Sequence, residues 1–406
     1  MDSIPYLLVG GYAAVHAARA IRERDARSRV VLVNSEAHAP YERPPLSKQL
    51  LFEPDYAAQD TLAEPSRFYD QHQIELRLQS RVMGIDRAAH AVTLENGETL
   101  KYEKLLLAPG SGAKKPEFEG GALAGVHVIR TLDDSLKLRA AFDEVRRVAI
   151  VGGSYLGLEV ASGARKRGVA ATVIDSNSGP WSKFAAEDLQ KFVRGRFEAA
   201  GVEFVFNQRV EKVNGEGKAE SVQTKSGPIE ADLVVAAIGA KLHTELAERA
   251  DLEVHPKHGI RVDEMLRTAD ERIWVAGDCA AYPEAFVGTL WHNEHYRNAQ
   301  WQGEVAGANM AGASQKFARA PYFFSDFLDL HMTLRGNPAG GHAARVLGRM
   351  DEGEFVQLYA DDAGVVKMAV TISHDQAKTR AIAEELEPLL WDGLKVGDYS
   401  AELVGL

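Results

Sequence analysis

Residues 148–157 read VAIVGGSYLG, and residues 158–175 continue as LEVASGARKRGVAATVID. An apolar β-branched run, a glycine-rich turn, a helical pattern and a second apolar run follow one another, which predicts strand, turn, helix and strand. Gly152 permits the tight turn, and Gly157 lets the helix pack closely on the strand. Because N–H groups at the start of such a helix can face a pyrophosphate, we expect a dinucleotide-binding α/β domain here.

The residues inside and after this turn indicate which dinucleotide binds. Gly153, Ser154 and Tyr155 fill the turn, and Ser154 stands where the motif usually has its central glycine. Asp175 ends the second strand about 20 residues after the turn, where a carboxylate accepts hydrogen bonds from an adenosine ribose. Asp175 would repel a 2′-phosphate by about 4 kcal/mol per pair of charges at close range, and residues 176–178 carry no arginine to offset this repulsion. NADH is therefore favoured over NADPH.

A second, weaker copy of this pattern opens the chain. Its expected elements are a strand at residues 6–9, a helix at residues 13–24 and a strand at residues 30–33. Glu36 follows the second strand as the candidate ribose acid. Only Gly10 and Gly11 separate the first strand from the next residue, a tyrosine, so this turn lacks a glycine and is one residue short of the G-x-G-x-x-G pattern. The pattern predicts a nucleotide site here as well, with its affinity in question.

A short motif far downstream supports this first site. Residues 272–280 read RIWVAGDCA, an apolar strand that ends in a small residue and a glycine and then presents Asp278 at the start of an expected helical region. A backbone that passes close to a cofactor needs glycine, and a carboxylate there can accept hydrogen bonds from a polyol. The two turns and this motif together predict two dinucleotides in one molecule.

Three further stretches carry a resemblance to a known family. They read PYERPPLSK at residues 40–48, GLEV at residues 157–160 and WHNEHYRNA at residues 291–299. With the motifs above, they make nearly the whole chain similar to the FAD- and NAD(P)H-dependent oxidoreductases that include apoptosis-inducing factor, monodehydroascorbate reductase and the ferredoxin reductases of bacterial oxygenase systems. The resemblance implies an α/β fold with two Rossmann-like domains, an FAD domain and an NAD domain inserted into it, followed by a small α+β domain.

The resemblance also implies roles for single residues. Lys48 would lie near the flavin, Glu159 would approach it from the NADH side, and these two with His295 are the candidate catalytic residues. The implied FAD contacts are Gly10, Gly11, Glu36, Arg43, Lys48, Asp278, Glu294 and His295, with Asp278 on the ribitol. The implied NADH contacts are Gly152, Gly153, Ser154, Tyr155, Gly157 and Asp175, with Tyr155 beside the nicotinamide path. The alternative for any one lysine or glutamate is an ordinary surface charge, and for a histidine in a helical segment it is a packed or exposed residue.

Domain boundaries follow from these anchors. The resemblance implies an FAD domain at residues 1–112 and 241–317, an NAD domain at residues 113–240 and a C-terminal α+β domain at residues 318–406. In the last of these we expect an aromatic run at residues 322–330, strands at 355–359 and 365–370, and a helix at 375–390. The aromatic run is interpreted as core and not as a platform for a ligand. Such a domain often carries an interface, which leaves a homodimer open.

Two further departures from the family pattern fall on the expected FAD domain. Pro109, within LLLAPG at residues 105–110, stands where the family usually has threonine, and proline removes a backbone donor. Residues 238–243 read IGAKLH and lack the usual proline and asparagine. Together with the shortened turn, these departures put the retention of FAD in question, although the residues for the chemistry are present.

Composition limits the remaining functions. A chain of 406 residues with 45% hydrophobic content can bury more than one core. The single cysteine, Cys279, excludes an intramolecular redox-active disulfide and suggests a reducing, cytoplasmic setting. A formal net charge of −11 argues against nucleic acid as a partner, since phosphate binding needs positive potential. We expect no membrane span, because no apolar run is long enough, and no metal.

The sequence therefore predicts an enzyme that passes hydride from NADH to FAD and then electrons to a ferredoxin-type carrier. Glu294 and His295 leave open a second reading, in which the acceptor is small, such as a quinone or the ascorbate radical. The altered FAD site leaves open a third, a nucleotide-gated binding protein like apoptosis-inducing factor with weak or lost catalysis. An acidic carrier would need a local basic patch, for which the candidates are Arg335, Arg345 and Arg349.

Overall fold

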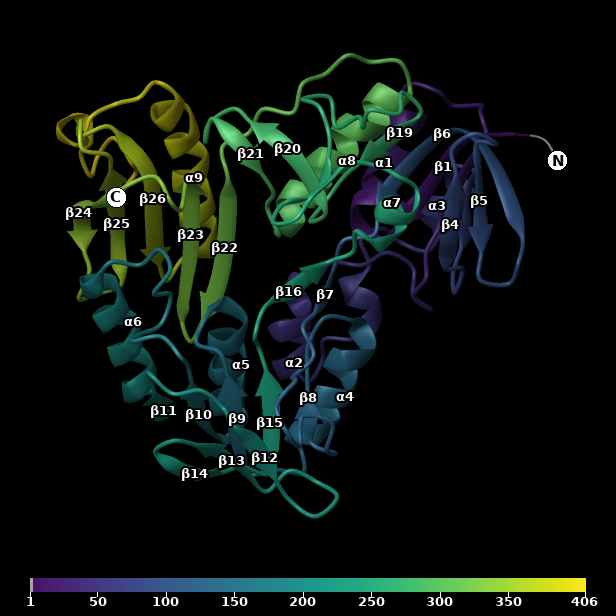
Figure 1. The fold of residues 1–406 in the computed structure, drawn as a ribbon. Helices are drawn as coiled ribbons and strands as arrows, with labels where there is room; N and C mark the ends of the chain where they lie inside the picture. The colour runs from purple at the N-terminus through teal and green to yellow at the C-terminus, as the bar shows by residue number, and fades with distance from the viewer. Residues whose placement is uncertain (1–2) are drawn as a thin grey trace. The chain divides into compact units, whose positions relative to one another are not determined.

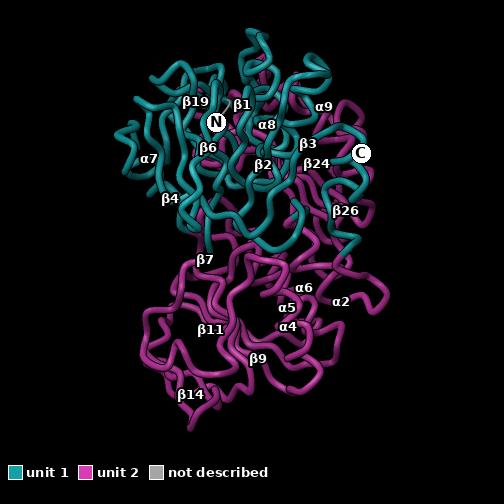
Figure 2. Tube along the Cα trace, turned by 90° about the vertical axis from the view of Figure 1, so that its right-hand side faces the viewer, with its two compact units in different colours: residues 1–42, 59–112, 241–321 teal, residues 43–58, 113–240, 322–406 magenta. Residues whose placement is uncertain are grey.

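The computed structural model describes residues 3–406, which form two compact units (Figures 1 and 2). Each unit is assembled from three separate segments of the chain. Unit 1 comprises Met1–Glu42, Gln59–Gly112 and Lys241–Pro321, and unit 2 comprises Arg43–Ala58, Ala113–Ala240 and Tyr322–Leu406. The chain passes from one unit to the other five times: after Glu42, in η2 (Ala58–Thr61), in β7 (Ser111–Ala113), in β16 (Ala240–Leu242) and after Pro321.

A mixed sheet with the order β3-β2-β1-β6-β5-β4, and with β19 paired to β6, lies at the centre of unit 1. The strands β1, β2, β3, β6 and β19 run parallel, and β4 and β5 are antiparallel additions. Its strands are β1 (Ile4–Gly10), β2 (Val30–Val33), β3 (Ile74–Arg77), β4 (Val82–Asp86), β5 (Ala91–Leu94), β6 (Thr99–Ala108) and β19 (Ile273–Val275). The fully buried VVLV of β2 is typical of a parallel strand covered on both faces.

Two helices, α1 (Tyr12–Arg22) and α8 (Tyr296–Met310), pack against each other in unit 1. Glycines on α8 allow a close approach. A Cβ atom at Gly303 would lie 2.2 Å from the Ala13 carbonyl oxygen, and one at Gly307 would lie 2.3 Å from that of Ala17. The backbone of α8 therefore lies directly on α1, and any larger side chain would separate the two helices.

The rest of unit 1 consists of a small sheet and short helices. The sheet has the order β17-β18-β20-β21. These elements are α3 (Arg67–Gln71), α7 (Glu245–Arg249), β17 (Val254–His255), β18 (Gly259–Arg261), β20 (Ala280–Glu284) and β21 (Thr289–Trp291). The sequence predicts a helical region that begins at Asp278, and this prediction is wrong. The residues after Asp278 form the strand β20, because the small buried residues Ala280 and Ala281 pair with β18.

Unit 2 contains a five-stranded parallel sheet with the order β11-β10-β9-β15-β8. Its strands are β8 (Val126–His127), β9 (Arg147–Val151), β10 (Ala170–Ile174), β11 (Val202–Val205) and β15 (Leu233–Ala236), and its helices are α4 (Leu132–Phe142), α5 (Tyr155–Lys166) and α6 (Glu187–Ala199). An antiparallel sheet of β12 (Lys212–Asn214), β13 (Ser221–Thr224) and β14 (Gly227–Glu230) adjoins it. The strand, turn, helix and strand predicted from residue 148 onward are confirmed.

The C-terminal part of unit 2 is a five-stranded antiparallel sheet with the order β22-β23-β26-β25-β24 and one long helix. Its elements are β22 (Tyr322–Phe327), β23 (Leu330–Gly336), β24 (His342–Arg349), β25 (Glu354–Ala360), β26 (Val366–Ser373), α9 (Gln376–Trp391) and η3 (Val396–Asp398). The helix begins where the sequence predicts, because the Asp375 carboxylate caps the N–H groups of Ala377 and Lys378. Most of the aromatic run is buried, with Tyr322, Phe324 and Phe327 at 9%, 9% and 1% exposure, which confirms its interpretation as core.

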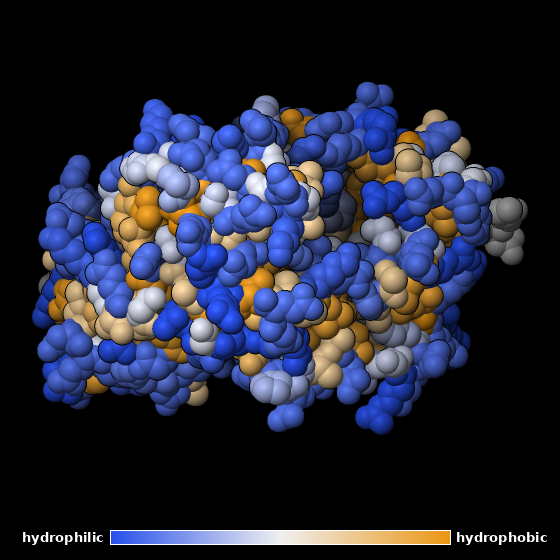
Figure 3. Space-filling view, turned by 90° about the horizontal axis from the view of Figure 1, so that it is seen from below, coloured by the Kyte–Doolittle hydropathy of each residue, from blue (hydrophilic) through white to orange (hydrophobic). Residues whose placement is uncertain are grey.

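Residues 43–58 fold against unit 2 as η1 (Pro44–Ser47) and α2 (Gln49–Phe52). Arg139 of α4 fixes this segment, since its guanidinium donates to the carbonyl oxygens of Leu50, Glu53, Pro54 and Tyr56. On α5, the place of a Cβ at Gly163 is filled by the ring of Phe52. The face of the molecule seen in Figure 3 is mostly hydrophilic, with apolar residues gathered in small groups.

Candidate functional site

The glycine turn of unit 2 has the geometry that a dinucleotide site needs. Gly152 has a φ of +112°, and a Cβ there would lie 2.4 Å from the Ala237 carbonyl oxygen. A Cβ at Gly157 would lie 1.8 Å from the Gly152 carbonyl oxygen, so α5 packs directly on the turn. Both predicted uses of glycine are confirmed. The first turn of α5 reads YLGL and is uncharged, which leaves the positive end of the helix dipole for an anion.

Asp175 lies beneath this turn. One carboxylate oxygen, Oδ2, accepts the N–H of Gly153. The other, Oδ1, accepts the backbone N–H of Asn177 at 2.8 Å and its side-chain amide at 2.7 Å. Asp175 thus supports the turn, a role that the sequence did not indicate. A carboxylate has about four acceptor positions, so these bonds leave capacity for ribose hydroxyls.

Lys48 and Glu159 form a buried ion pair. Lys48 Nζ lies 2.8 Å from Glu159 Oε1, and the two side chains are 10% and 7% exposed. The Lys48 ammonium also lies over the Phe324 ring, 5.0 Å from its centroid. Lys48 and Glu159 are therefore not ordinary surface charges. Lys48 follows the last residue of η1 and Glu159 lies on α5, and the fold brings the two side chains together.

Two serines that sequence reasoning missed complete the surroundings of Glu159. Ser47 Oγ donates to Glu159 Oε2 at 2.5 Å, and Ser325 Oγ donates to Oε1 at 2.6 Å. The carboxylate is thus held by one cation and two hydroxyl donors. The available signal was weak: Ser47 directly precedes the lysine, and Ser325 is a lone small polar residue in the aromatic run.

Tyr155 lies in an aromatic cluster within unit 2. Its ring centroid is 3.9 Å from that of Phe323, 5.5 Å from that of Phe184 and 5.7 Å from that of Trp181. Burial among these rings raises the pKa of the Tyr155 hydroxyl well above its ordinary value. Tyr155 is thus held in place as a neutral aromatic at the start of α5.

The glycine turn of unit 1 is shorter, as the sequence predicts. Gly10 has a φ of +138°, and a Cβ there would lie 2.1 Å from the Ala108 carbonyl oxygen, so Gly10 is the counterpart of Gly152. The helix α1 begins at Tyr12, two residues later. In unit 2, α5 begins three residues after Gly152, at Tyr155. The first turn of α1 reads YAAV and is also uncharged.

Asp278 lies between β19 and β20 with its side chain buried. It follows Gly277, which has a φ of +87°, and its Oδ2 accepts the Ser111 hydroxyl at 2.6 Å. The next residue, Cys279, is fully buried, and burial raises its pKa to about 12. Its thiol is therefore neutral near neutral pH, and a buried neutral thiol is a poor nucleophile.

The remaining expected FAD contacts of unit 1 are spread over two regions. Glu36, beyond β2, accepts the Tyr41 hydroxyl. His295 is buried and is the N-cap residue of α8, with its ring edge-on to that of Tyr296 at 5.0 Å. It therefore precedes the helix instead of lying within it. The Glu294 side chain is 40% exposed.

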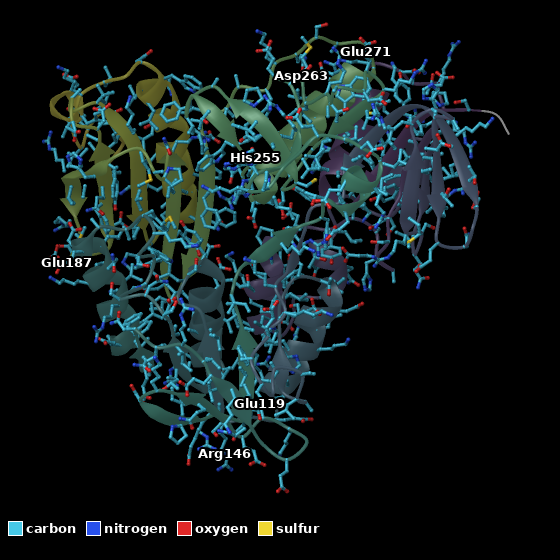
Figure 4. The ribbon with its side chains drawn as sticks, viewed as in Figure 1. Glu119, Arg146, Glu187, His255, Asp263 and Glu271 are labelled. Carbon is cyan, nitrogen blue, oxygen red and sulfur yellow. The ribbon has the colours of Figure 1, made fainter. Side chains whose placement is uncertain are left out.

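Glu294 is linked to a group of histidines in unit 1. Its Oε1 lies 3.3 Å from His292 Nε2, and His292 Nδ1 lies 3.0 Å from His258 Nδ1. His255, labelled in Figure 4, accepts the backbone N–H of His258. Burial and then the neighbouring His292 lower the pKa of His258. The three histidines thus contact mainly one another. Among residues 3–406, no group of three or more His, Cys, Asp or Glu side chains is arranged to hold a metal ion.

Arg43 and Arg335 both have hydrogen-bond partners within unit 2. Arg43 belongs to the segment packed on unit 2, where its guanidinium donates to the Arg130 carbonyl oxygen at 2.5 Å. Arg335 was a candidate for a basic docking patch, and this is wrong, because it is 3% exposed and donates to Glu387 and to the Ala383 carbonyl oxygen.

The other two arginines of the candidate patch also have partners. Arg345 donates to the Tyr399 carbonyl oxygen at 2.9 Å, and Arg349 pairs with Glu352. The C-terminal arginines therefore do not form the expected patch of uncommitted charge. Within the described part of the chain, no helix is both long and apolar enough to cross a membrane.

Comparisons of sequence relate this chain to known proteins. A family model described as pyridine nucleotide-disulphide oxidoreductase matches residues 8–303. The ferredoxin–NAD(+) reductase component of the anthranilate 1,2-dioxygenase system from Burkholderia cepacia is 36% identical over 94% of both chains. The rubredoxin-NAD(+) reductase from Pseudomonas putida is 35% identical over 81% of this chain and 85% of its own.

Comparisons of structure agree. The ferredoxin reductase for the CYP199A2 system from Rhodopseudomonas palustris matches with a TM-score of 0.90 and 27% identity over 98% of both chains. The reductase of the covalent putidaredoxin reductase–putidaredoxin complex matches with a TM-score of 0.89 and 26% identity, over 100% of this chain and 96% of that one.

Proposed function

The chain belongs to the pyridine nucleotide-disulphide oxidoreductase family, and from this premise we propose that it oxidises NADH through FAD and passes the electrons to a ferredoxin-type carrier. The observation that carries the proposal is the buried Lys48–Glu159 pair beside an intact dinucleotide turn. Its relatives include reductases of a ferredoxin and of a rubredoxin. The buried, neutral Cys279 excludes disulfide chemistry in this chain.

Residues of both units fit the two nucleotides. Gly152 and Gly157 let the turn and α5 pack closely, so that N–H groups at the start of α5 would face the NADH pyrophosphate, and Asp175 would accept hydrogen bonds from its ribose. In unit 1, the uncharged start of α1 suits the FAD pyrophosphate. The implied FAD contacts there are Gly10, Gly11, Glu36, Asp278, Glu294 and His295. From unit 2, Arg43 and Lys48 are the contacts that the family pattern adds.

The residues of this chain bind, orient and stabilise. Bound FAD supplies the chemistry that turns a two-electron hydride donor into a source of single electrons. Lys48 is held by Glu159 in one position, and its positive charge would stabilise negative charge that develops nearby. Ser47 and Ser325 fix the Glu159 carboxylate and so act through it as positioning residues. Tyr155 would limit how the nicotinamide enters.

We also propose the finer features that rest on the family pattern. The FAD domain would comprise residues 1–112 and 241–317, the NAD domain residues 113–240, and the C-terminal domain residues 318–406. The enzyme would act in the cytoplasm, which the lone free cysteine supports, and could form a homodimer.

The test is a visible spectrum of the protein reconstituted with FAD, before and after anaerobic NADH. We expect the bound flavin to bleach, and cytochrome c to be reduced only when a ferredoxin or rubredoxin is added. Reduction of a quinone without any carrier would instead support the small-acceptor function, for which Glu294 and His295 are the candidate residues. A flavin that binds and does not bleach would contradict the proposal and favour a nucleotide-gated binding protein.

A further inference from the structure

The strand β22 places three consecutive side chains around the Lys48–Glu159 pair. The Lys48 ammonium lies over the ring of Phe324, 5.0 Å from its centroid, and Ser325 Oγ donates to Glu159 Oε1 at 2.6 Å. Asp326 is the third. Because side chains alternate along a strand, Asp326 lies on the same face of β22 as Phe324. The edge strand of the C-terminal sheet thus brings a second carboxylate toward Lys48.

Asp326 is a mostly buried, ionised carboxylate. Its Oδ1 lies 2.6 Å from Nδ1 of His331, which is directly opposite on β23, and Gln376 Nε2 of α9 lies 3.4 Å from each carboxylate oxygen. Burial opposes ionisation, but the hydrogen bond with His331 and then the charge of Lys48 hold the pKa of Asp326 below its ordinary value. The Asp326 side chain is 17% exposed, so solvent screens its charge only in part.

The charges of this group do not sum to zero. Lys48 and Glu159 compensate each other, and Asp326 adds one more negative charge. Of the groups bonded to Asp326, Gln376 is neutral, and His331 is a cation only when it is protonated. When the His331 ring is neutral, the group therefore carries one net negative charge. A negative charge near a flavin opposes the uptake of electrons and so lowers the reduction potential.

We infer that Asp326 is a positioning residue of the Lys48 site and lowers the reduction potential of bound FAD. It acts by offsetting part of the positive charge that Lys48 presents to the flavin. The inference rests on the proposed function and concerns its second half. Oxidation of one NADH reduces two one-electron carriers and releases one proton, and a lower flavin potential favours electron transfer to the carriers.

The first experiment is Asp326→Asn, which keeps an acceptor for a ring N–H of His331 and removes the charge. Dye equilibration measures the midpoint potential of the bound flavin, and stopped flow measures flavin reduction by NADH and flavin oxidation by an added ferredoxin or rubredoxin. We expect the potential to rise by the equivalent of about threefold to tenfold in the equilibrium between flavin and NADH. Flavin reduction should become faster and carrier reduction slower, and Asp326→Glu should restore the original values.

The matched control is Asp329→Asn, in the turn after β22. Asp329 is 57% exposed and pairs with Arg196, so loss of its charge should leave the potential and both rates unchanged. If Asp326→Asn slows flavin reduction and carrier reduction alike, at an unchanged potential, the inference is overturned, because Asp326 then has only a structural role.

A second experiment needs no flavin. Urea unfolding of the apoprotein compares Asp326→Asn in the unchanged protein with the same substitution in Lys48→Met. We expect the substitution to be more unfavourable in the unchanged protein, because only there does an ammonium attract the carboxylate. Additive effects would overturn the inference and leave the proposed function intact. A bound flavin that NADH does not bleach would overturn the proposed function, and this cycle would still decide whether Asp326 acts on Lys48.

Discussion

At the scale of the residue, the arrangement around Glu159 decides what the site can do. Its carboxylate is buried and receives one ammonium and two hydroxyl donors, from Lys48, Ser47 and Ser325. Removing one partner of a buried pair leaves the other charge uncompensated, which costs more than the pair contributes as a whole. The Lys48–Glu159 pair should therefore affect both the stability of unit 2 and the rate of flavin reduction, and substitutions can separate these two effects.

Lys48→Met tests this link. We expect it to destabilise unit 2 by about 3–5 kcal/mol, because it removes one partner of a buried ion pair and leaves the Glu159 carboxyl group without its cation. The double variant Lys48→Met, Glu159→Gln should recover most of that loss, since the amide is neutral, its oxygen can accept from one serine hydroxyl and its NH2 group can donate to the hydroxyl oxygen of the other. Urea unfolding of the apoprotein measures this effect.

The same two variants test the chemistry. Both should slow flavin reduction at saturating NADH in stopped-flow measurements, because both lack the ammonium that Glu159 positions. An unchanged rate in the double variant, with restored stability, would show that Lys48 has only a structural role.

Asp175→Ala tests cofactor choice. Loss of the carboxylate removes the repulsion of a 2′-phosphate and also an acceptor for the Gly153 N–H. We expect kcat/KM with NADH to fall and the preference for NADH over NADPH to shrink by about tenfold to a hundredfold. The control is Asp143→Ala, an exposed acid of the same unit, which should leave the preference unchanged. An undiminished preference would assign Asp175 to the turn alone.

At the scale of the element, the contact between α1 and α8 organises unit 1. The backbone of α8 lies on that of α1 at Gly303 and Gly307, and α8 begins directly after His295 while α1 begins directly after the shortened turn. One helix contact thus sets the position of two groups that are expected to contact FAD. Changes in this contact should therefore affect both stability and flavin binding.

Gly307→Ala tests the contact. The new methyl group would lie 2.3 Å from the Ala17 carbonyl oxygen, so we expect a loss of about 1–3 kcal/mol from overpacking and weaker FAD binding. The matched control is Gly195→Ala in α6, where no atom lies within 4 Å of the new Cβ and where higher helix propensity should stabilise by up to about 1 kcal/mol. Equal Tm values for the two variants would contradict the close packing.

At the scale of the whole molecule, each unit is built from segments far apart in the chain, so its stability depends on groups that folding buries together. His16 is one of these, since burial in unit 1 lowers its pKa from 6.5 to about 4. Between these two values the unfolded chain binds a proton at His16 and the folded chain does not. Stability is therefore lost as the pH falls from about 6.5 toward 4.

His16→Leu tests this dependence. The unchanged protein should lose about 2 kcal/mol between pH 7 and pH 5 through His16, and the variant should lack that part of the loss. The measurement is urea unfolding of both apoproteins at the two pH values. Other histidines titrate equally in both, so identical losses would show that His16 is accessible to protons in the folded state.

Local patterns in the sequence were sufficient for much of the fold. The strand and helix around Gly152, the shortened turn at Gly10 and the start of α9 at Asp375 were predicted, because turns and caps depend on neighbouring residues. The family and its FAD and NADH chemistry could also be inferred from motifs. The segment after Asp278 shows the limit of such patterns. The sequence predicts a helix there, but pairing with the distant strand β18 makes it the strand β20.

What only the tertiary structure decided is which charges are buried and what accompanies them. The sequence by itself determined the positions of the motifs whose resemblance to a family implies that Lys48 and Glu159 lie at one site, whereas folding placed the two 2.8 Å apart and added Ser325 from the C-terminal sheet. Folding likewise buried Arg335 and removed it from the surface. The physical reason is that burial depends on surfaces brought together from distant parts of the chain, and a local pattern carries no information about which distant side chain will arrive.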